Sequence, residues 1–279
     1  MQNNKIPKII HYCWFGKGEL PLELKECVNT WKKNLKDYKF ICWSEENCTF
    51  EENEFVKTAY KEKKWAFVSD FYRVKALAEI GGIYLDTDVI VYRDFAPLLK
   101  ENTFLSFNYD CTIGTAVIGA EPNNPFILGI LKMYEVTKLR EGVNGKYIEE
   151  KNSEIISYGY NTNNYYFTWY ALKNYPDFIL NNHFQSLVDF VIYPKEDFEI
   201  GRVNGKQYTV HLNEGSWKSK QNNESFFKKG IKKILKKNGV VFNFIRVLVR
   251  KRRYKKVNKT LPFYDYATAQ IKGGQLPEL

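Results

Sequence analysis

Residues 81–91 read GGIYLDTDVIV, an apolar run that is entered through two glycines and interrupted by Asp86 and Asp88. Its apolar side chains, several of them β-branched, are typical of a strand in the middle of a sheet. Two aspartates at positions i and i+2 of a strand project to the same side, where ionised carboxylates are costly unless they are paired or bound to a cation. A divalent metal is the simplest counter-charge, although a strand that runs out into a polar turn also explains many Asp-x-Asp triplets.

The order of elements before this strand predicts an α/β fold. A strand at residues 8–15 is followed by a helix from Pro21 to about Asn34 and by a second strand at residues 38–43. A crossover helix between two short strands implies a parallel sheet with right-handed connections. We expect further helices at 55–63, 65–80, 125–139 and 165–173, further strands at 103–108, 112–119, 178–180, 187–192 and 207–211, and a loop or irregular insertion at 141–160.

The composition is that of a folded protein. The chain has 20 Tyr, 20 Phe and 6 Trp among 279 residues, which argues against disorder. Its five cysteines lack the spacing of a metal site, so we expect them to be reduced in a cytoplasmic protein. The polar residues 1–8 predict no signal peptide, and the apolar stretch 240–249 is shorter than the roughly 18 residues that span a membrane.

The net charge of +10 is concentrated near the C-terminus. Residues 218–259 hold 16 Lys and Arg against one acid, Glu224, so this segment carries +15 and the rest of the chain −5. The high isoelectric point therefore describes a basic tail attached to a mildly acidic body.

Two basic helices are predicted in this tail. In residues 225–237 apolar side chains gather on one side and lysines occupy the rest, and a second helix from Val240 carries Arg250 to Arg253 toward its far end. Such a segment, residues 224–256, can lie on an anionic membrane leaflet, or it can pack on the body as ordinary solvated helices. No recognised nucleic-acid module accompanies the charge, so we expect no nucleic acid partner.

A second polar group precedes the opening strand. In the predicted helix 65–80, Asp70 and Arg73 lie three residues apart on one face, with Ser69 beside them. Ser69 and Asp70 suit contact with a ligand, and the alternative is a local salt bridge on a solvated helix face.

The third polar group is VHLNEGSWK at residues 210–218. A strand ends at His211, and a short loop with Gly215 then presents Ser216, Trp217 and Lys218. A hydroxyl, an indole donor and an ammonium on a flexible backbone are suited to closing over phosphate oxygens. The alternative is an ordinary turn that Trp217 anchors to the core.

Three blocks in this order, IPKIIHYCWFG, WAFVSDFYRVKALAEIGGIYLDTDV and HLNEGSWK, resemble glycosyltransferase family 32. The family includes bacterial capsule and lipopolysaccharide sugar transferases and yeast initiating α-1,6-mannosyltransferases, and it is related to the glucosylating domain of large clostridial toxins. The resemblance extends from about Ile6 to Lys218. It implies a GT-A fold, with a mainly parallel central sheet flanked by helices.

The resemblance also implies an activity and a domain organisation. Residues 1–218 would form a retaining glycosyltransferase domain, followed by residues 219–279 as a basic helical extension. The charge of this extension, and not the resemblance, is what suggests a cytoplasmic protein that is peripheral on the inner face of the cell membrane, with packing on the body as the alternative. The enzyme would move a hexose from a UDP- or GDP-sugar to a glycan or lipid-linked acceptor in surface polysaccharide biosynthesis. Mn²⁺ or Mg²⁺ would neutralise the diphosphate leaving group. The alternative is a non-catalytic membrane- or nucleic-acid-associated binding protein on a degenerate GT-A scaffold.

The family's site residues carry over onto matching positions. Asp88 would bind the metal directly, and Asp86 would contact the ribose and donor sugar, or the metal through water. Asp70 and Arg73, in the family's SDxxR pattern with Ser69, would hold the donor hexose, with Tyr84 nearby. These intact residues argue against a degenerate scaffold.

The first and last blocks supply the remaining contacts. Trp14 would line the nucleoside pocket, where an aromatic ring can stack on the base. Ser216 and Trp217 would form a lid over the metal and the β-phosphate, with Lys218 beside them, and His211 would be a further metal or pyrophosphate ligand. Many relatives carry Gly-Pro before a threonine in the region facing the acceptor, where this chain has residues 166–168, YFT. This departure leaves the acceptor unassigned.

Overall fold

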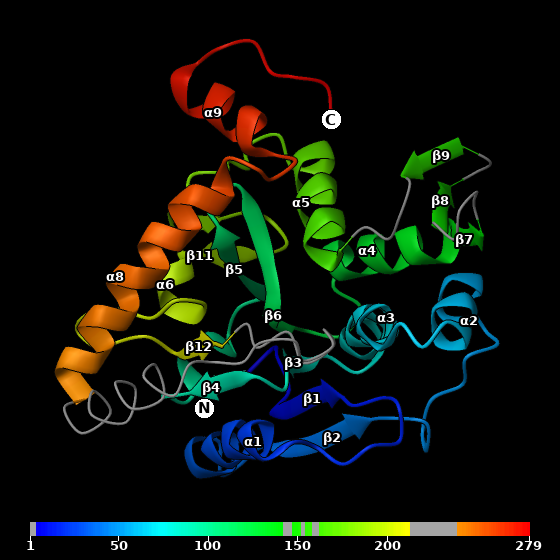
Figure 1. The fold of residues 1–279 in the computed structure, drawn as a ribbon, viewed down its shortest axis with the longest axis horizontal. Coiled ribbons are helices and arrows are strands. Elements are labelled where there is room, and N and C mark those ends of the chain that lie inside the picture. The colour runs from blue at the N-terminus through cyan, green and yellow to red at the C-terminus, as the bar shows by residue number, and fades with distance from the viewer. Residues whose placement is uncertain (1–3, 142–146, 152–153, 158–161, 213–238) are drawn as a thin grey trace, which may run out of the picture.

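The computed structural model of the chain describes residues 4–141, 147–151, 154–157, 162–212 and 239–279, which Figure 1 draws in colour. The side chains of residues 138–161 and 239–246 are outside this description.

A seven-stranded sheet forms the centre of the fold. Its strand order is β10-β11-β5-β6-β3-β1-β2. The parallel pairs are β1 with β2, β1 with β3, and β5 with β11, while β6 and β10 run against the other strands. The bounds are β1 Ile9–Cys13, β2 Lys39–Trp43, β3 Gly82–Leu85, β5 Thr103–Tyr109, β6 Thr112–Ala120, β10 Gln185–Ser186 and β11 Val191–Tyr193. The predicted fold class, α/β with a mainly parallel sheet flanked by helices, is confirmed.

Helices cover both faces of this sheet (Figure 1). Alternate residues of β3 point to opposite faces, so Ile83 and Leu85 join one hydrophobic core and Tyr84 joins the other. Helix α1 packs in the first core through Val28 and Trp31. The helices are α1 Leu22–Asn34, α2 Glu54–Lys61, α3 Trp65–Glu79, the 3₁₀ turn η1 Ala96–Leu98, α4 Pro125–Val136, α5 Asn163–Asn174, α6 Lys195–Phe198, α8 Gly239–Asn258 and α9 Tyr264–Lys272. The predicted helices at 21–34, 55–63, 65–80, 125–139 and 165–173 are all found, with ends shifted by a few residues.

The opening stretch is two strands and not one. β3 ends at Leu85, and β4, Val89–Val91, leaves the central sheet to pair antiparallel with β12, Thr209–His211. The break lies at residues 86–88, where the amide of Val89 donates to the carbonyl of Asp86 at 3.0 Å and closes a turn. The prediction of one continuous strand was wrong at the two aspartates, because polar residues with local turn hydrogen bonds end a strand.

Two other predictions were wrong. Residues predicted as a loop at 141–160 contain most of a three-stranded antiparallel sheet, β7 Thr137–Glu141, β8 Tyr147–Lys151 and β9 Glu154–Ser157. Helix α4 ends before it, because Thr137 takes an extended backbone and its hydroxyl donates to the carbonyl of Met133. Residues 178–180 are not a strand: the side chain of Gln270 binds the carbonyl of Phe178 and the amide of Leu180, replacing a strand partner.

The C-terminal helices pack on the body over the part that the structure describes. Val247 and Tyr254 of α8 are buried, and the Tyr254 ring stacks on Tyr109 with 4.5 Å between centroids. Asn258 binds Asp110 through its side chain, accepting from the backbone amide at 3.1 Å. In the described residues no helix is both long enough and apolar enough to span a bilayer. The predicted division at residues 218/219 lies outside the described residues and stays a prediction.

Candidate donor and metal site

Asp86 and Asp88 lie in the tight turn that connects β3 to β4. The amide of Asp86 donates to the carbonyl of Ala116 at 2.8 Å, so the turn starts where the pairing of β3 with β6 ends. The two carboxylates are therefore close for a different reason from the one predicted. The turn brings them together, and the alternation of a strand does not.

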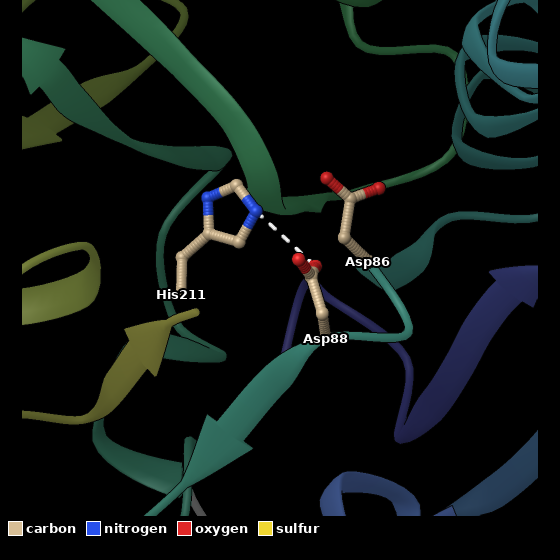
Figure 2. Close-up of side chains that lie close together, drawn as sticks. All are labelled: Asp86, Asp88 and His211. Atoms are coloured by element: carbon tan, nitrogen blue, oxygen red, sulfur yellow. Dashed lines mark ion pairs between the residues drawn. The ribbon is translucent and has the colours of Figure 1, made fainter. Parts of the chain in front are cut away.

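His211 reaches the same place from a distant part of the sequence. In the antiparallel pair of β4 and β12, His211 lies opposite Val89, and the amide of Leu212 donates to the carbonyl of Asp88 at 3.0 Å. The Nε2 atom of His211 is 3.2 Å from the Oδ1 atom of Asp88. One ligand atom from each of Asp86, Asp88 and His211 lies within 4.8 Å of the others, and Figure 2 shows the three side chains converging.

Glu199 fixes the other side of the His211 ring. Its Oε2 atom lies 2.9 Å from Nδ1 of His211, and its side chain is fully buried. Burial alone would lower the pKa of His211, but the carboxylates of Glu199 and Asp88 outweigh it and raise that pKa well above its usual value. Sequence reasoning missed Glu199, because a lone acid after a short helix carries no pattern that points to a histidine twelve residues later.

A buried arginine forms ion pairs with two carboxylates of the site, Asp70 and Asp86. Arg73 of α3 makes ion pairs with Asp70 at 2.9 Å and with Asp86 at 3.2 Å, and its guanidinium donates to the carbonyl of Thr115 at 2.6 Å. Only 6% of the Arg73 side chain and 11% of the Asp70 side chain are exposed. The alternative of a salt bridge on a solvated helix face is therefore wrong.

Tyr84 completes this group from β3. Its hydroxyl donates to Oδ1 of Asp86 at 3.0 Å, and the guanidinium of Arg73 lies over its ring, 4.5 Å from the centroid. Burial raises the pKa of Asp70 to about 6, against the opposing effect of the Arg73 charge. Burial would lower the pKa of Arg73, but the charges of Asp86, Tyr84 and Asp70 raise it, so the guanidinium stays charged and orders both aspartates.

The residues present fit a divalent cation. Two carboxylates and an imidazole supply oxygen and nitrogen ligands, a set that suits Mn²⁺ and in its oxygen part Mg²⁺. The side chains of Asp86, Asp88 and His211 are 25%, 11% and 14% exposed, so a cation can reach them from solvent. The contact of Glu199 with Nδ1 is the arrangement that commonly orients a metal-binding histidine.

The other predicted site residues are placed differently. Trp14 follows β1, and its indole N–H donates to the carbonyl of Gly18 at 2.5 Å, with the ring partly exposed. The hydroxyl of Ser69 donates to the carbonyl of Trp65 at 2.9 Å within helix α3, so it is occupied by its own helix. Ser216, Trp217 and Lys218 lie outside the described residues. The roles predicted for all of these residues stay predictions.

One region of the chain matches a known protein family. Residues 21–105 match the family described as a glycosyltransferase sugar-binding region containing a DXD motif. The matched region includes Asp70 and Arg73 together with the DXD motif itself, Asp86 to Asp88, and it ends before Glu199 and His211. The resemblance to DXD glycosyltransferases is thereby confirmed.

The chain is also similar over part of its length to individual curated proteins. The chain is 29% identical over 143 residues to inositol phosphoceramide mannosyltransferase 3 of Schizosaccharomyces pombe, covering 47% of this chain and 38% of that protein. It is 31% identical over 135 residues to mannosyl phosphorylinositol ceramide synthase SUR1 of Saccharomyces cerevisiae, covering 46% of this chain and 34% of that protein. The chain spans between about a third and just over half of the length of the curated relatives it matches. A solved structure, PaToxG glycosyltransferase, is 21% identical with a TM-score of 0.43, covering 61% of this chain and 70% of that one.

Proposed function

We propose that this protein is a metal-dependent, retaining glycosyltransferase that moves a hexose from a nucleotide-sugar donor to a glycan or lipid-linked acceptor. The observation that carries the proposal is the convergence of Asp86, Asp88 and His211 beside the buried Arg73 group, within a DXD family region. Gathering the carboxylates of Asp70, Asp86 and Asp88 at one point that solvent can reach carries an electrostatic cost that a folded scaffold without turnover does not need.

The residues of the site have separate tasks in this proposal. Asp88 and His211 hold the divalent cation, and Asp86 supports it while contacting the donor. A bound cation supplies Lewis-acid neutralisation of the leaving diphosphate. Asp70 accepts hydrogen bonds from donor hydroxyls, and Arg73 keeps Asp70 and Asp86 in position. Retention follows from front-face substitution, with the departing phosphate oxygen taking the proton of the acceptor hydroxyl.

The relatives suggest the donor sugar and the class of acceptor. Two of them are named as a mannosyltransferase and a synthase of a mannosylated inositol phosphoceramide. We therefore propose mannose as the first candidate hexose and a lipid-linked alcohol as the first candidate acceptor. Synthesis of a surface polysaccharide, in a bacterium, is the setting in which we place this activity.

Donor hydrolysis measured over a panel of UDP- and GDP-sugars tests the proposal directly. We expect one donor to be turned over with added Mn²⁺. Chelation should lower the rate at least about tenfold, because the charge of the leaving diphosphate is no longer neutralised, and added Mn²⁺ should restore it. An undiminished rate in the chelated protein would contradict metal dependence. Turnover of no donor under any condition would favour the non-catalytic scaffold.

The basic tail supports a proposal about location. On the described part of α8, the residues facing away from the body are exposed and include Arg252, Lys255 and Lys256, with exposed Val249 nearby. We propose that this face contacts anionic lipid, which would place the protein in the cytoplasm at the inner face of the cell membrane, near a lipid-linked acceptor.

Vesicle binding by a charge-neutralised variant tests this location. Changing Arg252, Lys255 and Lys256 together to glutamine should weaken binding to vesicles containing phosphatidylserine by about a hundredfold, since each basic residue near the surface contributes about 1 kcal/mol. The matched control changes three exposed lysines of the body region around α1, Lys32, Lys33 and Lys36, and should bind like the wild type. Equal binding by both variants, or binding that ignores anionic lipid, would contradict the membrane proposal.

A further inference from the structure

Arg250 is the residue of helix α8 that turns toward the metal-type cluster. Its guanidinium donates to the carbonyl of His211 at 2.8 Å, to the carbonyl of Glu199 at 3.1 Å and to the carbonyl of Leu212 at 3.4 Å. The residues that follow it, Lys251 to Arg253, are exposed. Arg250 therefore differs from its basic neighbours in position as well as in contacts. In Figure 1, α8 runs along the side of the molecule where α6 and β12 lie.

The three carbonyls that Arg250 binds belong to the two chain segments that carry and contact His211. His211 and Leu212 are consecutive, and Glu199 accepts the amide of His211 at 3.0 Å through its carbonyl while its carboxylate binds the His211 ring. The guanidinium thus ties together the two chain segments that determine where the imidazole lies. Its planar array of donors can bind several carbonyls at once in one geometry.

The strand that carries His211 is short, and contacts from outside its own sheet support it: the amides of Tyr208 and His211 donate to the carbonyls of Asp197 and Glu199 at 2.8 and 3.0 Å. β12 has three residues and pairs with β4 in a two-stranded sheet. A two-stranded pair is only marginally stable by itself, so its end needs contacts from outside the sheet. Glu199 orients the ring, whereas Arg250 holds the backbone from which the ring projects.

We propose that Arg250 is a positioning residue of the metal site, through which the C-terminal helix holds His211 Nε2 at Asp88. This proposal rests on the proposed function for the metal role of His211. It makes α8 a structural part of the donor site, in addition to any contact of its outer face with lipid.

Contacts away from Arg250 keep α8 in place when its guanidinium is removed. Val247 and Tyr254 are buried, Tyr254 stacks on Tyr109, and Asn258 binds Asp110. Lys251 also pairs with Glu196 at 3.6 Å. A substitution at Arg250 therefore tests the position of His211 with the helix still docked.

Binding of Mn²⁺ to the full-length protein without donor, followed by the electron paramagnetic resonance of the free ion, is the measurement. We expect Arg250→Gln to weaken the affinity about 10- to 100-fold, the usual effect of losing a group that orients a metal ligand. Arg250→Lys keeps one hydrogen-bond donor group but loses the planar guanidinium, so its Mn²⁺ affinity should fall between that of Arg250→Gln and that of the wild type. Arg93→Gln is the matched control: this exposed arginine also donates to a carbonyl, that of Lys206, at the far end of the β4–β12 pair. Its affinity should stay within about twofold of the wild type.

A double variant separates positioning from general support of the fold. If Arg250 acts through His211, Arg250→Gln should cause no further loss of Mn²⁺ affinity in a His211→Ala background. Additive losses, or wild-type affinity in Arg250→Gln alongside a weakened His211→Ala, would overturn the proposal. Wild-type affinity in His211→Ala itself would overturn the metal role of His211 in the proposed function, and this proposal with it. If Arg250→Gln does not fold, Arg250→Lys carries the same comparison.

Discussion

Replacing Asp88 with asparagine should lower the rate of sugar transfer by about a hundred- to a thousandfold, the equivalent of losing roughly 3–4 kcal/mol of charge neutralisation in the transition state. Asp88 is the carboxylate of the turn that contacts His211, with its Oδ1 atom 3.2 Å from Nε2 of the imidazole. Asparagine keeps the size of the side chain and removes its charge. The loss should appear mainly in turnover, and a higher Mn²⁺ concentration should not restore it.

The test compares the initial rates of Asp88→Asn and the wild type at increasing Mn²⁺ concentration, with the donor found in the panel of UDP- and GDP-sugars. Asp37→Asn is a suitable control, since its carboxylate is 82% exposed and forms only a long contact with Lys8 at 3.8 Å. The control should turn over like the wild type. Thermal unfolding of both variants without metal checks that the fold is intact. Wild-type turnover in Asp88→Asn would remove Asp88 from the metal site.

Replacing Arg73 with glutamine should lower the free energy of unfolding by about 3–5 kcal/mol, because it leaves Asp70 and Asp86 without the buried charge that compensates them. Arg73 has 6% of its side chain exposed and contacts both carboxylates and the carbonyl of Thr115. Because Arg73 and Asp70 are almost completely buried, water cannot replace the ion pair between them. Donor affinity should fall as well, since both aspartates depend on Arg73 for their position.

Chemical denaturation measures the stability change. Lys75→Gln on the same helix is the matched control, because Lys75 pairs with Glu52 at a more exposed position and such pairs contribute about 0–1 kcal/mol. Adding Asp70→Asn to Arg73→Gln should recover part of the lost stability, since one uncompensated carboxylate is removed. An Arg73→Gln variant as stable as the control would show that the buried group does not depend on its arginine.

Local patterns predicted the elements that surround the site. The crossover from residues 8–15 to 38–43 correctly indicated parallel pairing, because alternation of apolar residues and a proline helix start are properties of short segments. The Asp70–Arg73 spacing correctly indicated a contact, because residues three apart on a helix are always neighbours. Burial of this pair was not predictable in the same way, since it depends on β3 and β6 lying against α3.

Asp86 and Asp88 lie close together as predicted, but for a different reason from the one that the sequence suggested. A continuous strand was expected through residues 81–91, and the chain turns at 86–88 instead. The turn was not separable from a strand in the sequence, because β-branched residues lie on both sides of it. Whether β4 continues in the central sheet or leaves it depends on β12, a partner more than a hundred residues away.

The sequence by itself determined that this chain forms an α/β fold with a DXD motif beside an aspartate–arginine pair, because those features are set by residues within one helix or one strand–turn. The resemblance also pointed to His211 as a ligand, but only the tertiary structure decided that it lies at Asp88 and which residues hold it there. His211, Glu199 and Arg250 come from a two-stranded sheet, the end of a short helix and the C-terminal extension, and they meet around one imidazole. No local sequence pattern predicts that these residues lie together, since their proximity results from strand pairing and helix docking across long sequence separations.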